Sequence, residues 1–175
     1  KPMLYRIGDM AESDISVVEL SSFQLMTADS APDVAVITNI TPNHLNWHTG
    51  MDEYIAAKAK ILEGCARAVL NYENEITRNL ARTAECPVTL FSHDYIPDEE
   101  LREGDSAVYE KDGVIVFRAR GEEEFPILQV SDILLPGRHN VENYMAAIGV
   151  LDGLVSAKSV ETVAKTFGGV EHRLE

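Results

Sequence analysis

Basic residues, cysteine and long apolar runs are all scarce in this chain, and each scarcity excludes a class of protein. The 175 residues include 15 Lys and Arg against 29 Asp and Glu, for a formal net charge of -14. A nucleic-acid binder needs a basic face to displace phosphate counterions, so we expect no nucleic acid among the partners. No stretch approaches the roughly 18 apolar residues of a membrane span, and none has the pattern of a signal peptide. We therefore expect no membrane contact.

The two cysteines, Cys65 and Cys86, have a spacing that fits neither a zinc motif nor a redox pair. We interpret them as reduced thiols of a cytoplasmic protein. The hydrophobic fraction of 45% is enough for one globular domain with a sizeable core. The sequence opens at Lys1-Pro2 rather than at Met, so we expect it to be a piece of a longer protein.

Short apolar runs alternate with helical patterns in the first half of the chain. The expected strands are Ile15–Leu20, Val34–Ile40, Ala66–Asn71 and Val88–Phe91, and the expected helices are Asp52–Cys65 and Ile76–Ala84. This alternation indicates an α/β fold with a mostly parallel sheet flanked by helices.

The second half has a different pattern. Ser106–Glu110 and Val114–Arg118 flank Asp112-Gly113, a strong hairpin signal, and with Phe125–Val130 they predict a small antiparallel subsheet. Helices are expected over Asn140–Leu154 and Val160–Phe167. The apolar stripe of the first of these is predicted from Ala146, Ala147, Val150, Leu151 and Leu154.

Two polar residues follow directly on expected strands. Glu19 lies at the end of the first strand, and His44 lies in the turn after the second. Ligands of open α/β sheets collect at the carboxyl ends of the strands, so both are candidate ligands for a cation or a phosphate. The simpler interpretations are a carboxylate that caps a turn and a histidine bonded within its loop. His48 is interpreted as a loop residue only.

Lys58 falls inside the apolar stripe of its helix, four residues after Tyr54 and three before Ile61. Lys60 is expected to point to the polar side. Lys58 either extends its amine to water along the core surface or is partly desolvated. Desolvation favours the neutral amine, which can add carbon dioxide to form a carbamate, an oxygen ligand suited to magnesium.

Asn140 and Asn143 share one face at the start of a helix, and their amides suit the edge of an adenine ring. The simpler interpretation is that Asn140 caps the helix. Arg173 is a candidate phosphate ligand, although an exposed linker arginine is the default.

Five stretches resemble the Mur ligases, in the order in which that family carries them and across nearly the whole chain. They are Glu19-Leu20-Ser21-Ser22-Phe23-Gln24-Leu25, Thr38 to Leu45, Tyr54-Ile55-Ala56-Ala57-Lys58, Leu135 to Asn143, and His172-Arg173-Leu174-Glu175. The first stretch resembles the sequence typical of the branch of the family that adds D-glutamate. The resemblance implies a P-loop-type central ATPase domain with its first strands missing.

The resemblance also implies a role for each matching residue. Catalysis would depend on Lys58, His44 and Glu19, which would hold two magnesium ions, with Lys58 carbamylated in the intact enzyme. Ser21 and Gln24 would contact the muramoyl substrate. Asn140, Asn143 and Arg173 would bind ATP, the first two at the adenine.

The implied reaction is an ATP-dependent ligation in peptidoglycan precursor synthesis in the cytoplasm. ATP phosphorylates the carboxylate of UDP-N-acetylmuramoyl-L-alanine, and the amine of D-glutamate then displaces phosphate from the acyl-phosphate. Magnesium would neutralise charge that repels the attacking carboxylate.

The sequence departs from the family pattern in two respects. Asn43 and Asn46 stand where the family often has Asp, which removes negative charge near His44. No Gly-x-x-Gly-Lys-Thr/Ser phosphate loop occurs in the 175 residues. We therefore expect a partial central ATPase domain over residues 1–170 and the start of a linker over 171–175. Alone, the chain is expected to be inactive and prone to self-association through exposed sheet edge.

Two alternatives stay open. One is another member of the same superfamily, such as a different muramyl ligase or a folylpolyglutamate synthetase, although Ser21-Ser22-Phe23-Gln24 argues against it. The other is an α/β scaffold domain that kept the fold without catalysis, which the lack of a phosphate loop favours.

Overall fold

The computed structural model describes residues 7–29, 31–42 and 48–169. The helices are α1 (Ser22–Thr27), α2 (Met51–Ala59), α3 (Glu75–Thr83), α4 (Arg138–Val150) and α5 (Ala157–Thr166). The strands are β1 (Val34–Ile37), β2 (Arg67–Asn71), β3 (Val88–Ser92), β4 (Ser106–Lys111), β5 (Val114–Ala119) and β6 (Phe125–Gln129).

The strands form one six-stranded sheet in the order in which they occur along the chain. β1 to β4 pair in parallel, and β4, β5 and β6 pair antiparallel. The predicted α/β fold is therefore confirmed. The antiparallel strands are not a separate subsheet, because β4 belongs to both parts and continues the parallel sheet into the hairpin.

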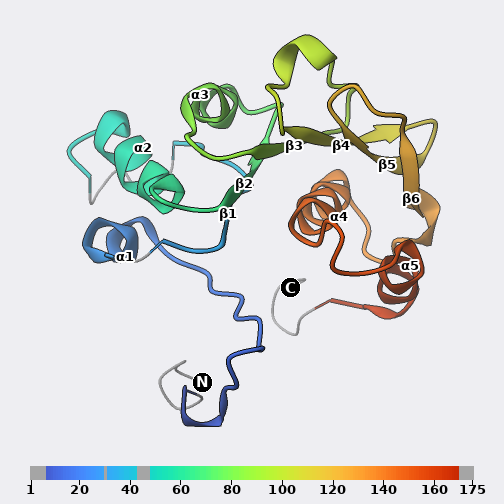
Figure 1. Ribbon diagram of the computed structural model, residues 1–175, viewed down its shortest axis with the longest axis horizontal. Coiled ribbons are helices and arrows are strands. Elements are labelled where there is room, and N and C mark those ends of the chain that lie inside the picture. The colour runs from blue at the N-terminus through green and yellow to red at the C-terminus, as the bar shows by residue number, and fades with distance from the viewer. Residues whose placement is uncertain (1–6, 30, 43–47, 170–175) are drawn as a thin grey trace.

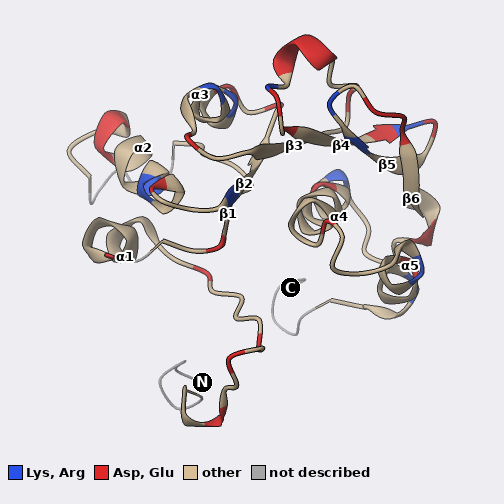
Figure 2. Cartoon of the chain, in the orientation of Figure 1, with Lys and Arg blue, Asp and Glu red and all other residues tan. Residues whose placement is uncertain are grey.

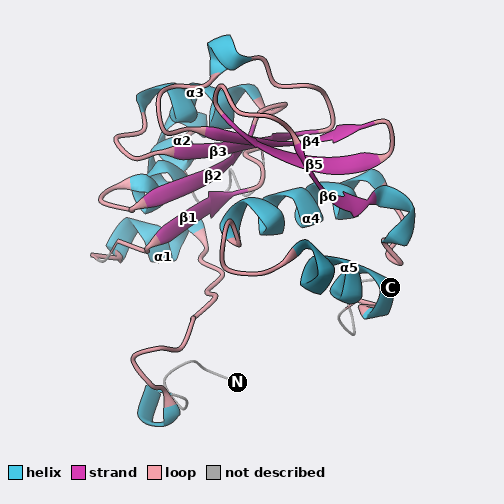
Figure 3. Ribbon diagram, turned by 45° about the vertical axis from the view of Figure 1, so that its right-hand side comes forward, coloured by secondary structure: helices cyan, strands magenta, loops and turns pink. Residues whose placement is uncertain are grey.

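Helices cover both faces of this sheet. α2 and α3 lie on one face, and α4 and α5 lie on the other (Figures 1 and 3). Alternate residues of the strands point to opposite faces, so Leu70 and Leu90 belong to the core under α2 and α3, while Val69 and Phe91 belong to the core under α4. Because both faces are covered, β2 and β3 are almost entirely buried, as expected for parallel strands between helices.

Gly149 lets α4 approach the sheet closely. A Cβ at this position would lie 3.0 Å from Cγ1 of Val69 and 3.1 Å from Cγ2 of Thr89. Those two side chains belong to the buried strands β2 and β3, where neighbouring atoms leave little room for movement. The absence of a side chain at Gly149 therefore sets the spacing between α4 and the sheet.

Replacing Gly149 by Ala is expected to lower the free energy of unfolding by about 1 kcal/mol. Alanine gains about 1 kcal/mol in helix propensity, but overpacking typically costs about 1–3 kcal/mol, and we expect the overpacking to dominate. Chemical denaturation measures the change. Ala147→Gly, on the exposed side of α4, is the matched control and should cost about 1 kcal/mol through propensity alone. A stabilised Gly149→Ala variant would contradict this close packing.

The expected strand Ile15–Leu20 is wrong for this structure. The segment has no regular secondary structure, and Val17 is 94% exposed. Figure 1 shows this part of the chain running away from the sheet below β1. A β-strand needs a neighbour for its backbone hydrogen bonds, and β1 pairs only with β2 in the described sheet. The apolar pattern of a segment does not show whether a neighbouring strand is present to pair with it.

The apolar stripe predicted for α4 is also partly wrong. The residues of α4 that are buried are Asn140, Val141, Met145, Ala146, Ile148 and Gly149. Ala147 is exposed, and Leu154 lies beyond the helix with 62% of its surface exposed. The helix begins at Arg138 and ends at Val150, earlier at both ends than expected, and Gly149 faces the sheet although it carries no apolar side chain.

Cys65 and Cys86 are both free and buried, with their sulfur atoms 3.2 Å apart. Burial, together with the hydrogen bond to Cys86, raises the pKa of the Cys65 thiol to about 12. Since the thiolate is the reactive form, the raised pKa lowers the reactivity of Cys65. The expectation of reduced thiols stays a prediction.

Acidic side chains dominate the loop between β3 and β4. The short 3-10 helix Asp98–Glu100 carries three of them in succession, and it stands out in red in Figure 2. Within the described ranges, no helix is both long and apolar enough to cross a membrane.

Candidate active site

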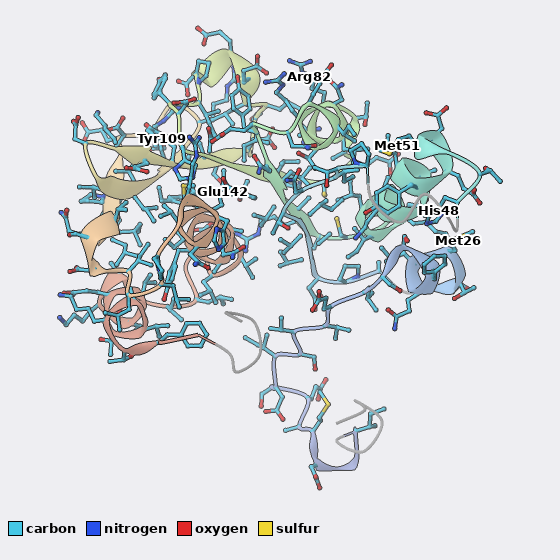
Figure 4. The ribbon with its side chains drawn as sticks, turned by 180° about the vertical axis from the view of Figure 1, so that it is seen from behind. Met26, His48, Met51, Arg82, Tyr109 and Glu142 are labelled. Carbon is cyan, nitrogen blue, oxygen red and sulfur yellow. The ribbon has the colours of Figure 1, made fainter. Side chains whose placement is uncertain are left out.

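Helices α1 and α2 meet through the side chain of His48. Nε2 of His48 lies 2.9 Å from Oγ of Ser22, the first residue of α1. The imidazole stacks on Phe23 at 5.2 Å between ring centroids and is tilted against Tyr54 of α2 at 5.3 Å. His48 is only 6% exposed, and Figure 4 labels it beside the two helices. The interpretation of His48 as only a loop residue missed this role, because no sequence pattern pairs it with Ser22.

Lys58 lies on the same side of α2 as Tyr54, as its helical spacing predicted. Its side chain is partly buried, and Nζ lies 6.0 Å from the centroid of the Tyr54 ring. A cation at this distance from an aromatic face is weakly attracted to it. The residues Lys58, Tyr54, His48 and Ser22 therefore form one continuous set of contacts from α2 to α1.

Lys60 does not point to the polar side as expected. Its Nζ donates to the backbone oxygens of Met26 at 3.1 Å and Ala28 at 3.3 Å. These carbonyls belong to the C-terminal end of α1 and lack helical partners, so a lysine there satisfies them and suits the helix dipole. Lys60 therefore attaches the end of α1 to the segment that follows α2.

Ser21 and Gln24, the predicted substrate residues, form the capping box of α1. Oγ of Ser21 accepts from the backbone N of Gln24 at 3.3 Å, and Oε1 of Gln24 accepts from the backbone N of Ser21 at 2.8 Å. Ser-x-x-Gln is the sequence signature of such a box, so this structural role could have been predicted. It fixes both side chains at the start of α1.

Glu19 lies two residues before this capping box, in the exposed extended segment rather than at the end of a strand. His44, the second predicted magnesium ligand, lies outside the described residues. Among the residues that the structure describes, no three His, Cys, Asp or Glu side chains lie close enough together to hold a metal. Glu19 and Lys58 supply only part of the predicted ligand set, and of the two only the carboxylate of Glu19 carries oxygen donors of the kind that a hard cation prefers.

The two predicted adenine ligands differ in their exposure to solvent. Asn140 is buried and its Nδ2 donates to the backbone oxygen of Pro136 at 2.8 Å, whereas Asn143 is exposed. The interpretation of Asn140 as the helix cap is wrong, because the cap is Gly137 and Asn140 lies inside the first turn. Arg173 lies outside the described residues.

Three asparagines link the carboxyl ends of β1 and β2. Nδ2 of Asn74 donates to Oδ1 of Asn39 at 2.6 Å and to the backbone oxygen of Ile40 at 3.0 Å. Nδ2 of Asn71 donates to the backbone oxygen of Thr38 at 3.0 Å. These bonds fix the chain just before the loop that carries His44. Sequence reasoning missed them, because cross-strand bonds depend on the register.

Replacing His48 by Phe is expected to lower the free energy of unfolding by about 1 kcal/mol, since the ring contacts stay and only the bond to Ser22 is lost. His48→Ala removes the buried ring as well and is expected to cost about 3 kcal/mol. Thermal and chemical denaturation measure both changes. Equal losses for the two variants would show that the ring does not pack between α1 and α2.

A sequence profile described as the Mur ligase middle domain matches residues 3–151. The chain belongs to this family. The Mur ligase resemblance read from the five motifs is thereby confirmed.

Curated relatives of this Mur ligase middle domain are named UDP-N-acetylmuramoylalanine–D-glutamate ligase. Those of Acetivibrio thermocellus and Clostridium perfringens are each 44% identical over 99% of this chain. The chain spans 36% of the length of each of these two relatives.

Solved structures of the family share the fold. A MurF crystal structure from Acinetobacter baumannii has a TM-score of 0.56 at 23% identity, over 82% of this Mur ligase chain and 31% of its own. A pseudomurein peptide ligase type C from Methanothermus fervidus has a TM-score of 0.55 at 17% identity, over 82% and 36%. At these identities the likeness concerns the fold alone.

Proposed function

We propose that the longer protein to which this chain belongs is an ATP-dependent ligase that adds D-glutamate to UDP-N-acetylmuramoyl-L-alanine during peptidoglycan precursor synthesis. The observation that carries the proposal is the 44% identity, over 99% of the chain, to relatives named for that reaction. The sequence from Glu19 to Leu25, which resembles that of the D-glutamate-adding branch, also supports the proposal.

The geometry of α1 and α2 supports the proposed substrate side of this site. Oε1 of Gln24 is engaged by Ser21, so the amide N–H groups of Gln24 are the donors that it can offer to the muramoyl substrate. Since His48 holds α1 against α2, Ser21 and Gln24 would keep a fixed position relative to Lys58. We propose that this pairing of helices orients the substrate carboxylate.

Two magnesium ions belong to the proposal, held by Glu19, His44 and a carbamylated Lys58. When bound, the metal would neutralise charge between the phosphates and the substrate carboxylate. The run Tyr54-Ile55-Ala56-Ala57-Lys58, which matches the family pattern, supports the carbamate, and Lys58 is partly buried on α2. Carboxylate and carbamate oxygens are ligands that magnesium prefers.

The nucleotide side is proposed from α4. Asn143 is exposed near the start of the helix and would contact the adenine, while the bond from Asn140 to Pro136 would keep the preceding turn in place. Arg173 would hold phosphate or ribose. We propose a cytoplasmic location, where ATP is available and where Cys65 and Cys86 stay reduced.

The 175 residues alone are proposed to be inactive and to self-associate. They contain no phosphate-loop motif, so the backbone amides and lysine that hold nucleotide phosphates would be lacking. In the described part of the chain, β1 has a neighbouring strand on one side only, and exposed Ile15 and Val17 add apolar surface nearby. Analytical ultracentrifugation of the chain at increasing concentration tests the self-association.

The proposed activity is tested with the full-length protein, UDP-N-acetylmuramoyl-L-alanine and magnesium ATP. Phosphate release should depend on D-glutamate, and L-lysine, diaminopimelate and a dipeptide should give background rates. Activity with one of the other acceptors instead would favour a different ligase of the superfamily. Lack of nucleotide hydrolysis, with no Gly-Lys-Thr/Ser in the upstream sequence, would favour the scaffold alternative.

A further inference from the structure

His93 follows β3 directly and lies between two carboxylates. Its Nδ1 is 3.1 Å from Oε2 of Glu110 on β4, and its Nε2 is 3.4 Å from Oε1 of Glu142 on α4. Only 10% of the His93 side chain is exposed, against 30% for Glu110 and 29% for Glu142. The imidazole therefore connects the carboxyl end of the parallel sheet to α4 at a position largely shielded from water.

A second connection runs beside the first. Oε1 of Glu73, in the loop after β2, accepts from the backbone N of His93 at 2.6 Å. Oε2 of Glu73 pairs with Nη2 of Arg138 at 2.9 Å, and Nε of Arg138 lies 4.0 Å from Glu142. Burial alone would raise the pKa of Glu73, but the bond from His93 and the charge of Arg138 outweigh it and lower the pKa.

The two carboxylates contact the ring in different ways. Nδ1 of His93 is hydrogen-bonded to Glu110, whereas Nε2 lies within ion-pair distance of Glu142 but makes no hydrogen bond in the described structure. Glu73 and Arg138 are the other charged groups that face this cluster.

We propose that His93 is a positioning residue that holds the start of α4 against the sheet for nucleotide binding. This inference rests on the proposed function, in which Asn140 and Asn143 contact the adenine. Glu142 lies between these two asparagines in the sequence, so fixing its carboxylate fixes the helical turn that carries them. Loss of the contact would let this turn move without unfolding the sheet.

The contact itself is tested on the 175-residue chain by NMR of the imidazole nitrogens. Glu142→Gln should shift the ¹⁵N resonance of Nε2 of His93, whereas Glu103→Gln should leave both ring nitrogens unchanged. Unchanged His93 resonances in Glu142→Gln would overturn the proposal. This measurement needs no enzyme activity, so it stands whether or not the proposed reaction is correct.

The positioning role is tested in the full-length ligase with His93→Gln and Glu142→Gln, and with Glu103→Gln, an exposed acid of the β3–β4 loop, as the control. Each of the first two variants should raise the KM for ATP about three- to tenfold, in line with the coupling of contacting charged residues. The KM for D-glutamate and kcat should stay within about twofold. The KM for ATP of the double variant should be no higher than that of the single variant with the higher KM.

The comparison of substrates separates a positioning role from a general loss of stability. Equal effects on all substrates, or an unchanged KM for ATP, would overturn the inference while leaving the D-glutamate reaction intact. If His93→Gln fails to fold, Glu142→Gln still decides. A full-length protein without D-glutamate-dependent activity would instead overturn the proposed function.

Discussion

Replacing Lys58 by Ala in the full-length protein is expected to reduce D-glutamate-dependent ligation more than about 100-fold. The expectation follows from its proposed role, since even residues that only support a metal ligand typically change activity by about 10–100-fold. Lys58 is half-buried beside Tyr54 on α2 and ends the run that matches the family pattern. Steady-state kinetics with and without a short-chain carboxylate measure the loss, and the carboxylate should restore part of the rate.

Lys60→Ala is the matched control for Lys58→Ala. Lys60 has the same charge and lies two residues away, but it bonds the carbonyls of Met26 and Ala28. Its loss should cost about 1 kcal/mol of stability and should leave kcat within a few-fold of the original. A fully active Lys58→Ala variant would show that Lys58 only extends its amine to water. Incorporation of ¹³C-labelled carbon dioxide, detected by NMR in the loaded enzyme, tests the carbamate directly.

Replacing Asp105 by Ala is expected to lower the free energy of unfolding by about 2–3 kcal/mol, the cost of leaving a buried donor without its charged acceptor. Asp105 is 4% exposed; its Oδ1 accepts from the backbone N of Val88 at 2.7 Å, and its Oδ2 accepts from Nε of Arg102 at 3.0 Å. The guanidinium also donates to the backbone oxygens of Ala84 and Cys86. Removing the carboxylate leaves a buried N–H without an acceptor and an arginine without its counter-charge.

The Asp105→Asn variant separates these two losses. Its side-chain oxygen can still accept from Val88, whereas the charge and the oxygen that accepts from Arg102 are lost. We expect a cost of about 1.5–2 kcal/mol. Glu103→Ala, an exposed acid in the same loop, should change stability by no more than about 0.5 kcal/mol. Urea denaturation at constant ionic strength measures all three. An Asp105→Ala variant whose free energy of unfolding lies within about 1 kcal/mol of the original would contradict this role of the Asp105 carboxylate.

The sequence was most informative where a segment is buried on both sides. Ala66–Asn71 and Val88–Phe91 were predicted as strands almost to the residue, because parallel strands between helices are continuous apolar runs. Asp112-Gly113 located the hairpin, with Asp112 at a φ of 51° and Gly113 at 78°, the positive values that such turns favour.

The errors occur where a feature depends on a distant partner. Ile15–Leu20 has the composition of a strand but no neighbouring strand in the described structure. The prediction of the apolar stripe of α4 was partly wrong because Gly149, which has no apolar side chain, packs closely against the sheet. The roles of His48 and His93 were not predicted. His48 contacts a residue 26 positions away in the sequence, and His93 contacts residues at least 17 positions away. No local pattern encodes such pairs.

The order of the strands has a consequence for how the chain folds. Each strand from β2 to β6 pairs with the strand that precedes it in the sequence, so the sheet contains few pairings between distant segments. Low sequence separation between contacts favours fast folding, and the sheet can grow as the chain leaves the ribosome. The core under α2 and α3 draws on residues up to Val116 of β5, whereas the core under α4 also needs residues after Gln129. The face under α2 and α3 can therefore be built from an earlier part of the chain than the face under α4.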